Sequence, residues 1–312
     1  MPQTSIPLPH IQPDCADWLL RGGLAPLSLC GRNLLPIVQG GMGIGVSANR
    51  LSGSVAALGG MGTVSSVDLR RHHPDLVART SGLGIGPDAK LAIDAANLEA
   101  LEREITLARA RSQGRGLLAI NVMRAVSAYG PSVRRALECG IEQQVPLIAA
   151  GGVRRFEDIA YLQGLGASAV QLGTPFAVTL ECDAHAEFKR VLAEATDDQL
   201  VEFTSVAGLP ARAVSTPWLR AYLAIENKLQ AVAHVKSRCT KSFDCLAQCG
   251  LRDGMKTWGQ FCIDHQLAAA LRGDLKKGLF FRGVGALPFG TQIRSVRDLV
   301  RTLLTGDQLA AV

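Results

Sequence analysis

VPLIAAGGVRRFEDIAYLQGLGASAVQLGTPF, residues 145–176, is the stretch that decides the fold of this chain. A short apolar run over 145–150 stops at a Gly-Gly pair, and a second one over 168–172 stops at Gly-Thr-Pro. Between them, 156–165 carries apolar residues on or near one helical face, which predicts a helix. Two strands joined by a helix are nearly always parallel and right-handed, so the stretch predicts a βαβ unit.

Glycines follow both predicted strands of this unit, at Gly151, Gly152 and Gly173. Glycine has no Cβ, so backbone N–H groups at these turns can approach a ligand closely. In a β/α barrel, the loops after the last two strands and a nearby helix N-terminus form the usual phosphate site. The residues allow two interpretations: a phosphate cradle for a cofactor, or an ordinary βαβ unit with glycine at its turns.

The same alternation of apolar runs and helical segments continues on the N-terminal side. It predicts five β-α units over 34–58, 61–112, 117–139, 145–165 and 168–195. All five strands are short apolar runs, as expected for strands covered on both faces. A barrel and a doubly wound sheet would both give this pattern, so the class is α/β with the architecture open at this point.

Composition limits the function classes. The 312 residues are 47% hydrophobic with 33 glycines and 5% aromatics, typical of a soluble α/β enzyme. The net charge of +6 is spread along the chain, which argues against a nucleic-acid partner. No stretch approaches the ~18 apolar residues of a membrane span. The N-terminus resembles no secretory leader, and the eight cysteines are expected to be reduced thiols in the cytoplasm.

Six segments, in this order, resemble the nitronate monooxygenase (2-nitropropane dioxygenase) family. They are PIVQGGMGIGVS, LSGSVAALGGMGTVSS, AINVM, PLIAAGG, AVQLGTPF and SVAGLPARAV, and they span roughly residues 34–214. The resemblance implies an FMN-dependent (β/α)₈ barrel that oxidises alkyl nitronates with O₂ to a carbonyl compound and nitrite. An NAD(P)H-dependent quinone or enoyl reductase on the same scaffold is the alternative enzyme.

The resemblance also implies which residues contact the cofactor. The first-strand residues would line the isoalloxazine edge through main-chain groups, and residues after the second and third strands would approach the flavin. The glycine turns of the last two units would hold the phosphate. In chain order these residues are Gln39, Gly40, Gly41, Met42, Ser65 (or Ser66), Asn121, Gly151, Gly152, Gln171, Leu172, Gly173 and Thr174.

One departure from the family pattern bears on activity. The family has three further βα units between the AINVM-type and PLIAAGG-type strands, and one of them carries a Gly-Gly-His motif with the catalytic base. That motif is absent from this sequence, so no catalytic residue is assigned. About 80–100 residues would be missing at about 30 residues per unit. The sequence therefore predicts an incomplete barrel of about five of eight units, shortened near 139–145. An inactive family member that retains only FMN-phosphate motifs, or that self-associates as a homo-oligomer through open strand edges, is the alternative from another class.

The predicted organisation has three parts. Residues 1–33 form an irregular N-terminal arm with a short helix near 17–21, residues 34–214 the FMN-type barrel, and residues 215–312 a helical C-terminal extension. The extension carries a cysteine run of four, Cys239, Cys245, Cys249 and Cys262. Such gaps occur in iron–sulfur and zinc ligand sets, and the run loosely resembles that of some four-iron flavin barrel reductases, whose first gap is shorter. Four buried thiols packed between helices are the other interpretation, and no metal is assigned.

Overall fold

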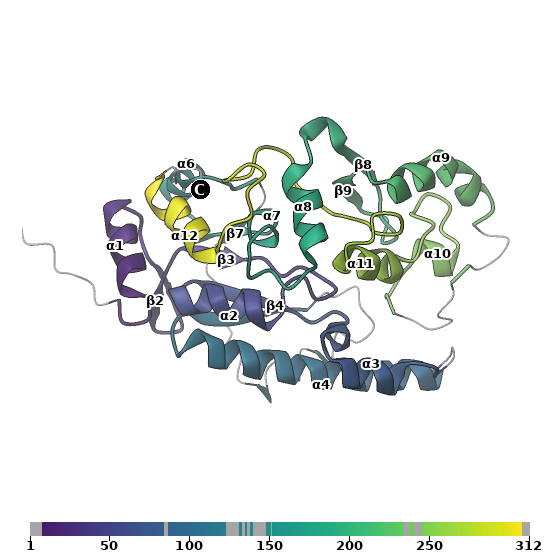
Figure 1. The fold of residues 1–312 in the computed structure, drawn as a ribbon, viewed down its shortest axis with the longest axis horizontal. Helices are drawn as coiled ribbons and strands as arrows, with labels where there is room; N and C mark the ends of the chain where they lie inside the picture. Colours follow the sequence, from purple (N-terminus) through teal and green to yellow (C-terminus); the bar gives the residue numbers. More distant parts are fainter. Residues whose placement is uncertain are drawn as a thin grey trace, which may run out of the picture.

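A five-stranded parallel sheet forms the centre of the computed structural model, which describes residues 8–83, 87–122, 131–132, 135, 138–139, 148–150, 152–233, 238–239 and 245–307 (Figure 1). The strands are β3 (Ile37–Gln39), β4 (Met61–Ser65), β5 (Leu117–Asn121), β6 (Ile148–Ala150) and β7 (Ala169–Leu172). Every pairing between them is parallel. The predicted α/β class with five recognisable strands is confirmed.

The order of the strands separates a barrel from a doubly wound sheet. It runs β5-β4-β3-β7-β6, so the last strand pairs with the first. In a barrel the strands follow chain order around a ring, and the last closes on the first. If the five strands are numbered 1 to 5 in chain order, a doubly wound sheet with three strands on one side would have the order 3-2-1-4-5. That order would place β6 beside β3, in the position that β7 occupies here. The sheet is therefore a barrel arc.

The two ends of this arc are β5 and β6. Each pairs with a single neighbour among the described residues. In chain order the segment between them runs through 139–145, the predicted position of the shortening, and residues 140–147 lie outside the described part of the chain. The shortening predicted near 139–145 falls between these two strands and stays a prediction.

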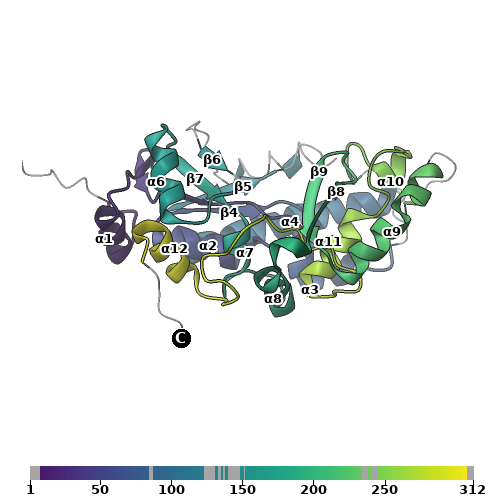
Figure 2. The same ribbon diagram turned by 90° about the horizontal axis from the view of Figure 1, so that it is seen from above.

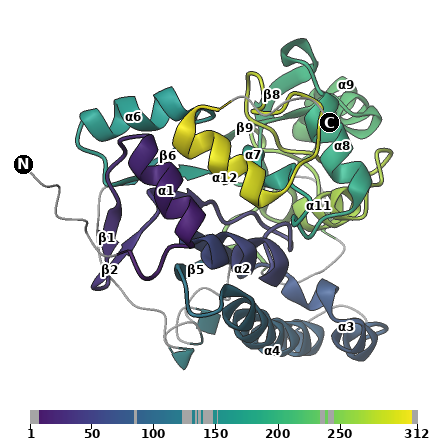
Figure 3. The same ribbon diagram turned by 60° about the vertical axis from the view of Figure 1, so that its left-hand side comes forward.

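Helices cover one face of the sheet, which corresponds to the outside of a barrel (Figure 2). Leu35, Ile37, Val170 and Leu172 pack there against a helical layer that includes a C-terminal helix. The first helix and the last lie side by side in this layer (Figure 3). The helices of the layer are α1 (Pro13–Arg21), α2 (Asn49–Leu58), α4 (Pro87–Ser112), α6 (Phe156–Gly164), α7 (Thr174–Ala177) and α12 (Val296–Thr305).

An N-terminal hairpin covers the other face of the sheet. Its strands, β1 (Leu27–Leu29) and β2 (Arg32–Leu34), pair antiparallel and pack their leucines against Val38, Met61 and Ala169. The short helix expected near 17–21 is present as the end of α1, but the rest of the arm is not irregular, because a hairpin follows this helix. The side chains of Leu27, Leu29 and Leu34 are buried against strands that come later in the chain, so the hairpin can pack only once the sheet has formed.

A second lobe follows the sheet. It holds an antiparallel hairpin and several helices packed on two apolar clusters. The hairpin lies within residues 34–214, the range predicted to be barrel. Its elements are α8 (Ala186–Glu194), η2 (Asp197–Gln199), β8 (Leu200–Thr204), β9 (Pro210–Val214), α9 (Pro217–Ala231), α10 (Gly250–Asp253) and α11 (Ile263–Leu271). Two short elements, η1 (Leu69–His72) and α3 (Pro74–Thr80), link β4 to α4. Within the described ranges no helix is long and apolar enough to cross a bilayer.

Candidate functional site

Three predicted cofactor residues share the inner face of the arc at its carboxyl edge. Ser65 of β4 pairs in register with Asn121 of β5, and Gln171 of β7 pairs with Val38 of β3. Side chains alternate between the faces of a strand. Because Met61, Leu117 and Ala169 contact the hairpin on the inner face, Ser65, Asn121 and Gln171 point to that same side. The fold therefore collects these three polar groups above the apolar floor of the arc.

The turn after β3 is held by side chains as well as by backbone. The amide of Gly40 donates to the carbonyl of Leu172 at 2.6 Å, and the amide of Met42 donates to Ser47 Oγ at 2.9 Å. Gln39 is fully buried; its Oε1 accepts from the amide of Thr63 at 2.9 Å and its Nε2 donates to the carbonyl of Gly40. Both polar atoms of the Gln39 side chain therefore have hydrogen-bond partners within the protein, so a ligand would contact Gln39 through its main chain.

Gly41 and Asn121 are in direct contact. A Cβ built on Gly41 would lie 2.2 Å from the Cβ of Asn121 and 2.9 Å from its Nδ2. Such approaches do not occur between real side chains, so glycine is required here because of Asn121. The glycine turn after β3 is therefore a point of close approach. The group that approaches Gly41 is the side chain of Asn121, another predicted cofactor residue, at the end of β5.

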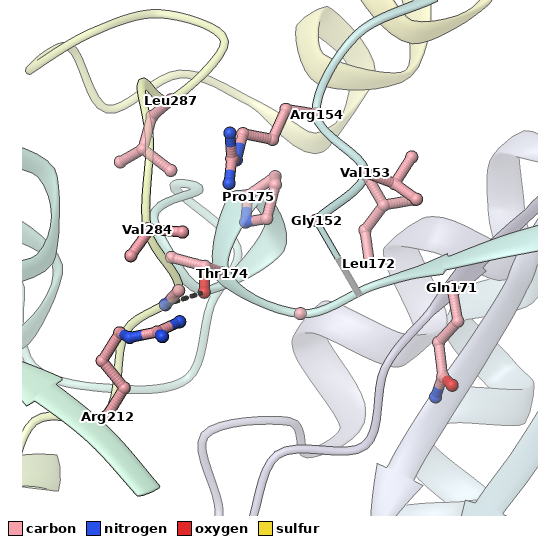
Figure 4. A pocket seen from close by; sticks show the side chains of 12 residues that line it. Gly152, Val153, Arg154, Gln171, Leu172, Thr174, Pro175, Arg212, Val284 and Leu287 are labelled. Carbon is pink, nitrogen blue, oxygen red and sulfur yellow. Dashed lines mark hydrogen bonds between the residues drawn. The ribbon is translucent and has the colours of Figure 1, made fainter. Parts of the chain in front are cut away.

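A cleft of about 340 Å³ opens beside the carboxyl ends of β6 and β7 (Figure 4). Volumes of this order suit small-molecule sites. Five predicted residues line it: Gly152, Gln171, Leu172, Gly173 and Thr174. The remaining lining residues were not predicted: Val153, Arg154, Pro175, Arg212, Gly283, Val284 and Leu287. Gly151 lies outside the described residues.

A buried arginine shapes the outer wall of the cleft. Arg282 donates from Nε to the carbonyl of Leu192 at 2.8 Å and from Nη1 to that of Gly283 at 2.9 Å. Burial lowers the pKa of Arg282 below its usual value, and the side chain is still placed to hold the 283–287 loop through charge-assisted bonds. The amide of Gly283 in turn donates to Thr174 Oγ1 at 3.3 Å, which links this loop to β7.

Two guanidinium groups flank the cleft. Arg154 follows β6, and its Nη1 lies so close to Gly285 that a Cβ there would be 2.1 Å away. Arg212 comes from β9 and pairs with Glu202 across the hairpin. Figure 4 shows Arg154 and Arg212 on two sides of Thr174 and Pro175, with Gln171 on the far side of the strand end. Glycine turns between two arginines are suited to an anion such as a phosphate.

Two histidines, His72 and His73, lie near the turn after β3, and neither ends a strand of the sheet. His72 of η1 places Nε2 2.8 Å from the carbonyl of Gly45, and His73 places Nε2 2.9 Å from Glu104. His185 caps α8 by accepting from the amide of Glu187 at 3.1 Å. Neither sequence nor structure therefore assigns a catalytic base.

A buried carboxylate supports the same turn from the second lobe. Asp183 Oδ2 accepts from the amides of Ala48 and Leu51, each at 3.1 Å, at the start of α2. Burial raises the pKa of Asp183, and the two amide donors oppose that shift. Asp183 is 132 residues from Leu51 in the chain, so the helix start depends on a distant residue.

A parallel sheet in barrel order, with a cleft at the carboxyl edge of its last two strands, is the architecture of the β/α-barrel class. The sequence profile of the Nitronate monooxygenase family matches residues 113–306, more than half of the chain. The chain belongs to the nitronate monooxygenase family, a family of oxidoreductases.

Individual relatives are more distant. A Saccharomyces cerevisiae protein named "Putative nitronate monooxygenase" is 36% identical over 78 residues, which are 25% of this chain and 19% of that protein. The chain thus aligns with about a fifth of that curated relative. Among solved structures, FabK from Thermotoga maritima is 19% identical, with 94% of this chain and 95% of that chain covered and a TM-score of 0.46. The nitroalkane oxidase from Streptomyces ansochromogenes is 18% identical, with 88% and 95% covered and a TM-score of 0.45.

Proposed function

We propose that this chain binds FMN and oxidises alkyl nitronates with O₂ to a carbonyl compound and nitrite. The observation that carries the proposal is the cleft between the glycine turns of β6 and β7, flanked by Arg154 and Arg212. Family membership supports oxidoreductase chemistry, and the cleft supports a cofactor that ends in a phosphate.

The residues of the cleft fit a phosphate group. Space is open around the position of a Cβ at both Gly152 and Gly173, with no atom within 4 Å. Gly152 has a φ of +74°, a conformation that L side chains rarely adopt. Backbone amides at these turns, Thr174 and the two arginines would hold the phosphate. Arginine suits this role because its fork of N–H groups matches phosphate oxygens.

The inner polar face would receive the ring end of the cofactor. The turn over Gly40, Gly41 and Met42 would lie along the isoalloxazine edge, with Ser65 and Asn121 beside it. When bound, a flavin supplies the electron transfer between nitronate and O₂. The chain's own contribution would be to bind and orient both molecules above the apolar floor that the N-terminal hairpin provides.

The proton chemistry follows from the residues that are present. No described histidine ends a strand of the sheet, and the Gly-Gly-His motif is absent from the sequence. A neutral nitroalkane must lose a proton before oxidation, whereas a nitronate is already deprotonated. We therefore expect turnover with preformed nitronates and little with the parent nitroalkanes.

A binding experiment tests the cofactor assignment. FMN and riboflavin are titrated against the full chain by visible absorption, together with Arg154→Ala and Arg212→Ala. Each arginine is expected to contribute about 1.5–3 kcal/mol to phosphate binding, or about 10- to 150-fold in Kd. Arg190→Ala is the matched control, because Arg190 pairs with Glu187 and Glu194 along α8 and does not line the cleft. Equal affinity for FMN and riboflavin would contradict the phosphate assignment.

A turnover experiment tests the substrate assignment. O₂ uptake and nitrite are followed after adding a preformed alkyl nitronate to the FMN-loaded chain. FMN binding without nitronate turnover would reject the substrate and leave the cofactor in place. NADH oxidation with a quinone acceptor is then measured, because a reductase on the same scaffold is the alternative. A chain that takes up no FMN would reject both enzymes.

A further inference from the structure

The turn between β3 and α2, residues 40–48, holds a buried isoleucine in a strained backbone conformation. Ile44 has a φ of +51° and is only 3% exposed. A left-handed backbone is a genuine outlier for a β-branched residue, and it persists only where surrounding contacts fix it. Segments held in this way cluster at ligand-binding sites, where the fixed shape serves the ligand. The contacts that fix the 40–48 turn therefore bear on the proposed ring site.

Two carboxylates from distant elements bind the chain where this turn enters α2. Glu104 belongs to α4, which packs along α2 (Figure 1), and it is 1% exposed. Its Oε2 accepts from the amide of Asn49 at 2.7 Å and from Asn49 Nδ2 at 2.8 Å. Asp183 accepts from the amides of Ala48 and Leu51. The first amides of a helix have no partner within it, so these carboxylates satisfy three of them and fix where α2 starts.

Two adjacent histidines link Glu104 to the turn itself. His73 places Nε2 2.9 Å from Glu104 Oε1, so this buried carboxylate has partners on both of its oxygens. His72 places Nε2 2.8 Å from the carbonyl of Gly45, the residue directly after Ile44. A Cβ on Gly45 would lie 2.1 Å from that nitrogen, and Gly45 has a φ of +72°, so glycine is required here. Two successive residues thus contact the carboxylate and the strained turn.

Ser47 joins this network to two predicted cofactor residues. It is fully buried; its Oγ accepts from the amide of Met42 at 2.9 Å, and its carbonyl accepts from the amide of Ser65 at 3.0 Å. The next two residues in the chain are ones that the two carboxylates hold. Movement of the α2 start would therefore displace groups that the proposed site places beside the isoalloxazine ring.

We propose that Glu104 is a positioning residue for the ring of the bound flavin. The proposal rests on the FMN assignment above, and it concerns how the 40–48 turn is held rather than which groups touch the ring. Glu104 fixes the start of α2 through Asn49 and the segment after η1 through His73, so Ile44 keeps its strained backbone before any ligand arrives. A preorganised turn of this kind spares the cost of ordering when the ring binds. Without Glu104 the turn can relax, so ring binding weakens while the phosphate contacts of the cleft stay intact.

Flavin titrations of the full chain test the proposal. FMN and riboflavin are titrated by visible absorption against Glu104→Ala and the isosteric Glu104→Gln, and the reduction potential of the bound flavin is measured. If the competent turn falls to about a tenth of the population in Glu104→Ala, both Kd values rise about 10-fold. Because the two ligands share the ring and differ in the phosphate, the factor should be the same for both. Glu104→Gln keeps an acceptor oxygen and should lose less. The potential should shift in both variants, because contacts to the ring tune it.

Two control variants separate positioning from other effects. Glu99→Gln changes a carboxylate of the same helix that pairs with Arg79 and Arg103, so it should leave both Kd values and the potential unchanged. Arg154→Ala removes a cleft residue and should weaken the binding of FMN alone. The ring and phosphate ends of the cofactor are thus tested by different residues.

Hydrogen exchange of the amides of residues 48–51 reports the loss of Glu104 without any flavin, and it should be faster in Glu104→Ala. Faster exchange with unchanged Kd values and an unchanged potential would show a purely structural role and overturn the proposal. A larger loss for FMN than for riboflavin would also overturn it, because the effect would then lie at the phosphate. Both outcomes leave the FMN assignment in place, whereas a wild-type chain that binds neither flavin would overturn the two together.

Discussion

Gly41→Ala should destabilise this chain, and Asn121 should be the reason. The new Cβ would lie 2.2 Å from Asn121 Cβ and 2.8 Å from its Cγ. The nearest atom is attached directly to the β5 backbone, so a change of rotamer cannot move it away. Overpacking of this kind costs about 1–3 kcal/mol, which lowers the Tm of a chain of this size by several degrees. Urea unfolding followed by circular dichroism measures the loss.

The same turn offers a matched control. Gly43 has no atom within 4 Å of a Cβ, so Gly43→Ala should leave stability unchanged or raise it by up to about 1 kcal/mol. Asn121→Ala keeps the clashing Cβ, whereas Asn121→Gly removes it. Gly41→Ala should therefore be rescued by Asn121→Gly and not by Asn121→Ala, with a coupling energy of at least about 1 kcal/mol. Equal stability of Gly41→Ala and Gly43→Ala, or rescue of Gly41→Ala by Asn121→Ala, would refute the reasoning.

Three further predictions follow from other contacts. Gly62→Ala should cost about 3 kcal/mol because its Cβ would meet the carbonyl oxygen of Ser52 at 1.8 Å, whereas Gly164→Ala, in open space, serves as the control in the same urea assay. Arg282→Met should cost about 2–4 kcal/mol and increase proteolysis of the 283–287 loop, because the carbonyls that its guanidinium holds lose their donor; an unchanged cleavage pattern would contradict this. Burial raises the pKa of Asp183 above its usual value, so the folded chain binds this proton more tightly than the unfolded chain. The stability that proton binding contributes therefore falls as pH rises from about 3.8 through the raised pKa. This part of the pH dependence of unfolding should vanish in Asp183→Asn.

The sequence predicted well whatever depends on neighbouring residues. The strands, the long helix before β5 and the glycine turns after β6 and β7 follow from short apolar runs, helical periodicity and the backbone freedom of glycine. Five of the predicted cofactor residues line the cleft, in those turns or at the end of β7.

Long-range pairing was beyond the sequence. Five βα units are compatible with several strand orders, and only the pairing of β7 with β3 separated a barrel arc from a doubly wound sheet. Arg212 sits on a hairpin far along the chain from Gly173, and nothing in its local pattern marks it as a residue of this cleft. The N-terminal leucines show no regular pattern in the sequence, because the surface that they cover belongs to other segments.

The sequence by itself determined the α/β class, the family and the glycine turns, because each is encoded within a few tens of contiguous residues. The tertiary structure decided which groups meet: Gly41 with Asn121, Arg154 and Arg212 across one cleft, and Asp183 with the start of α2. Such meetings depend on the closure of loops tens to more than a hundred residues long. Local propensity carries no information about those closures, since they are fixed by how the sheet, the helices and the second lobe bury apolar surface together.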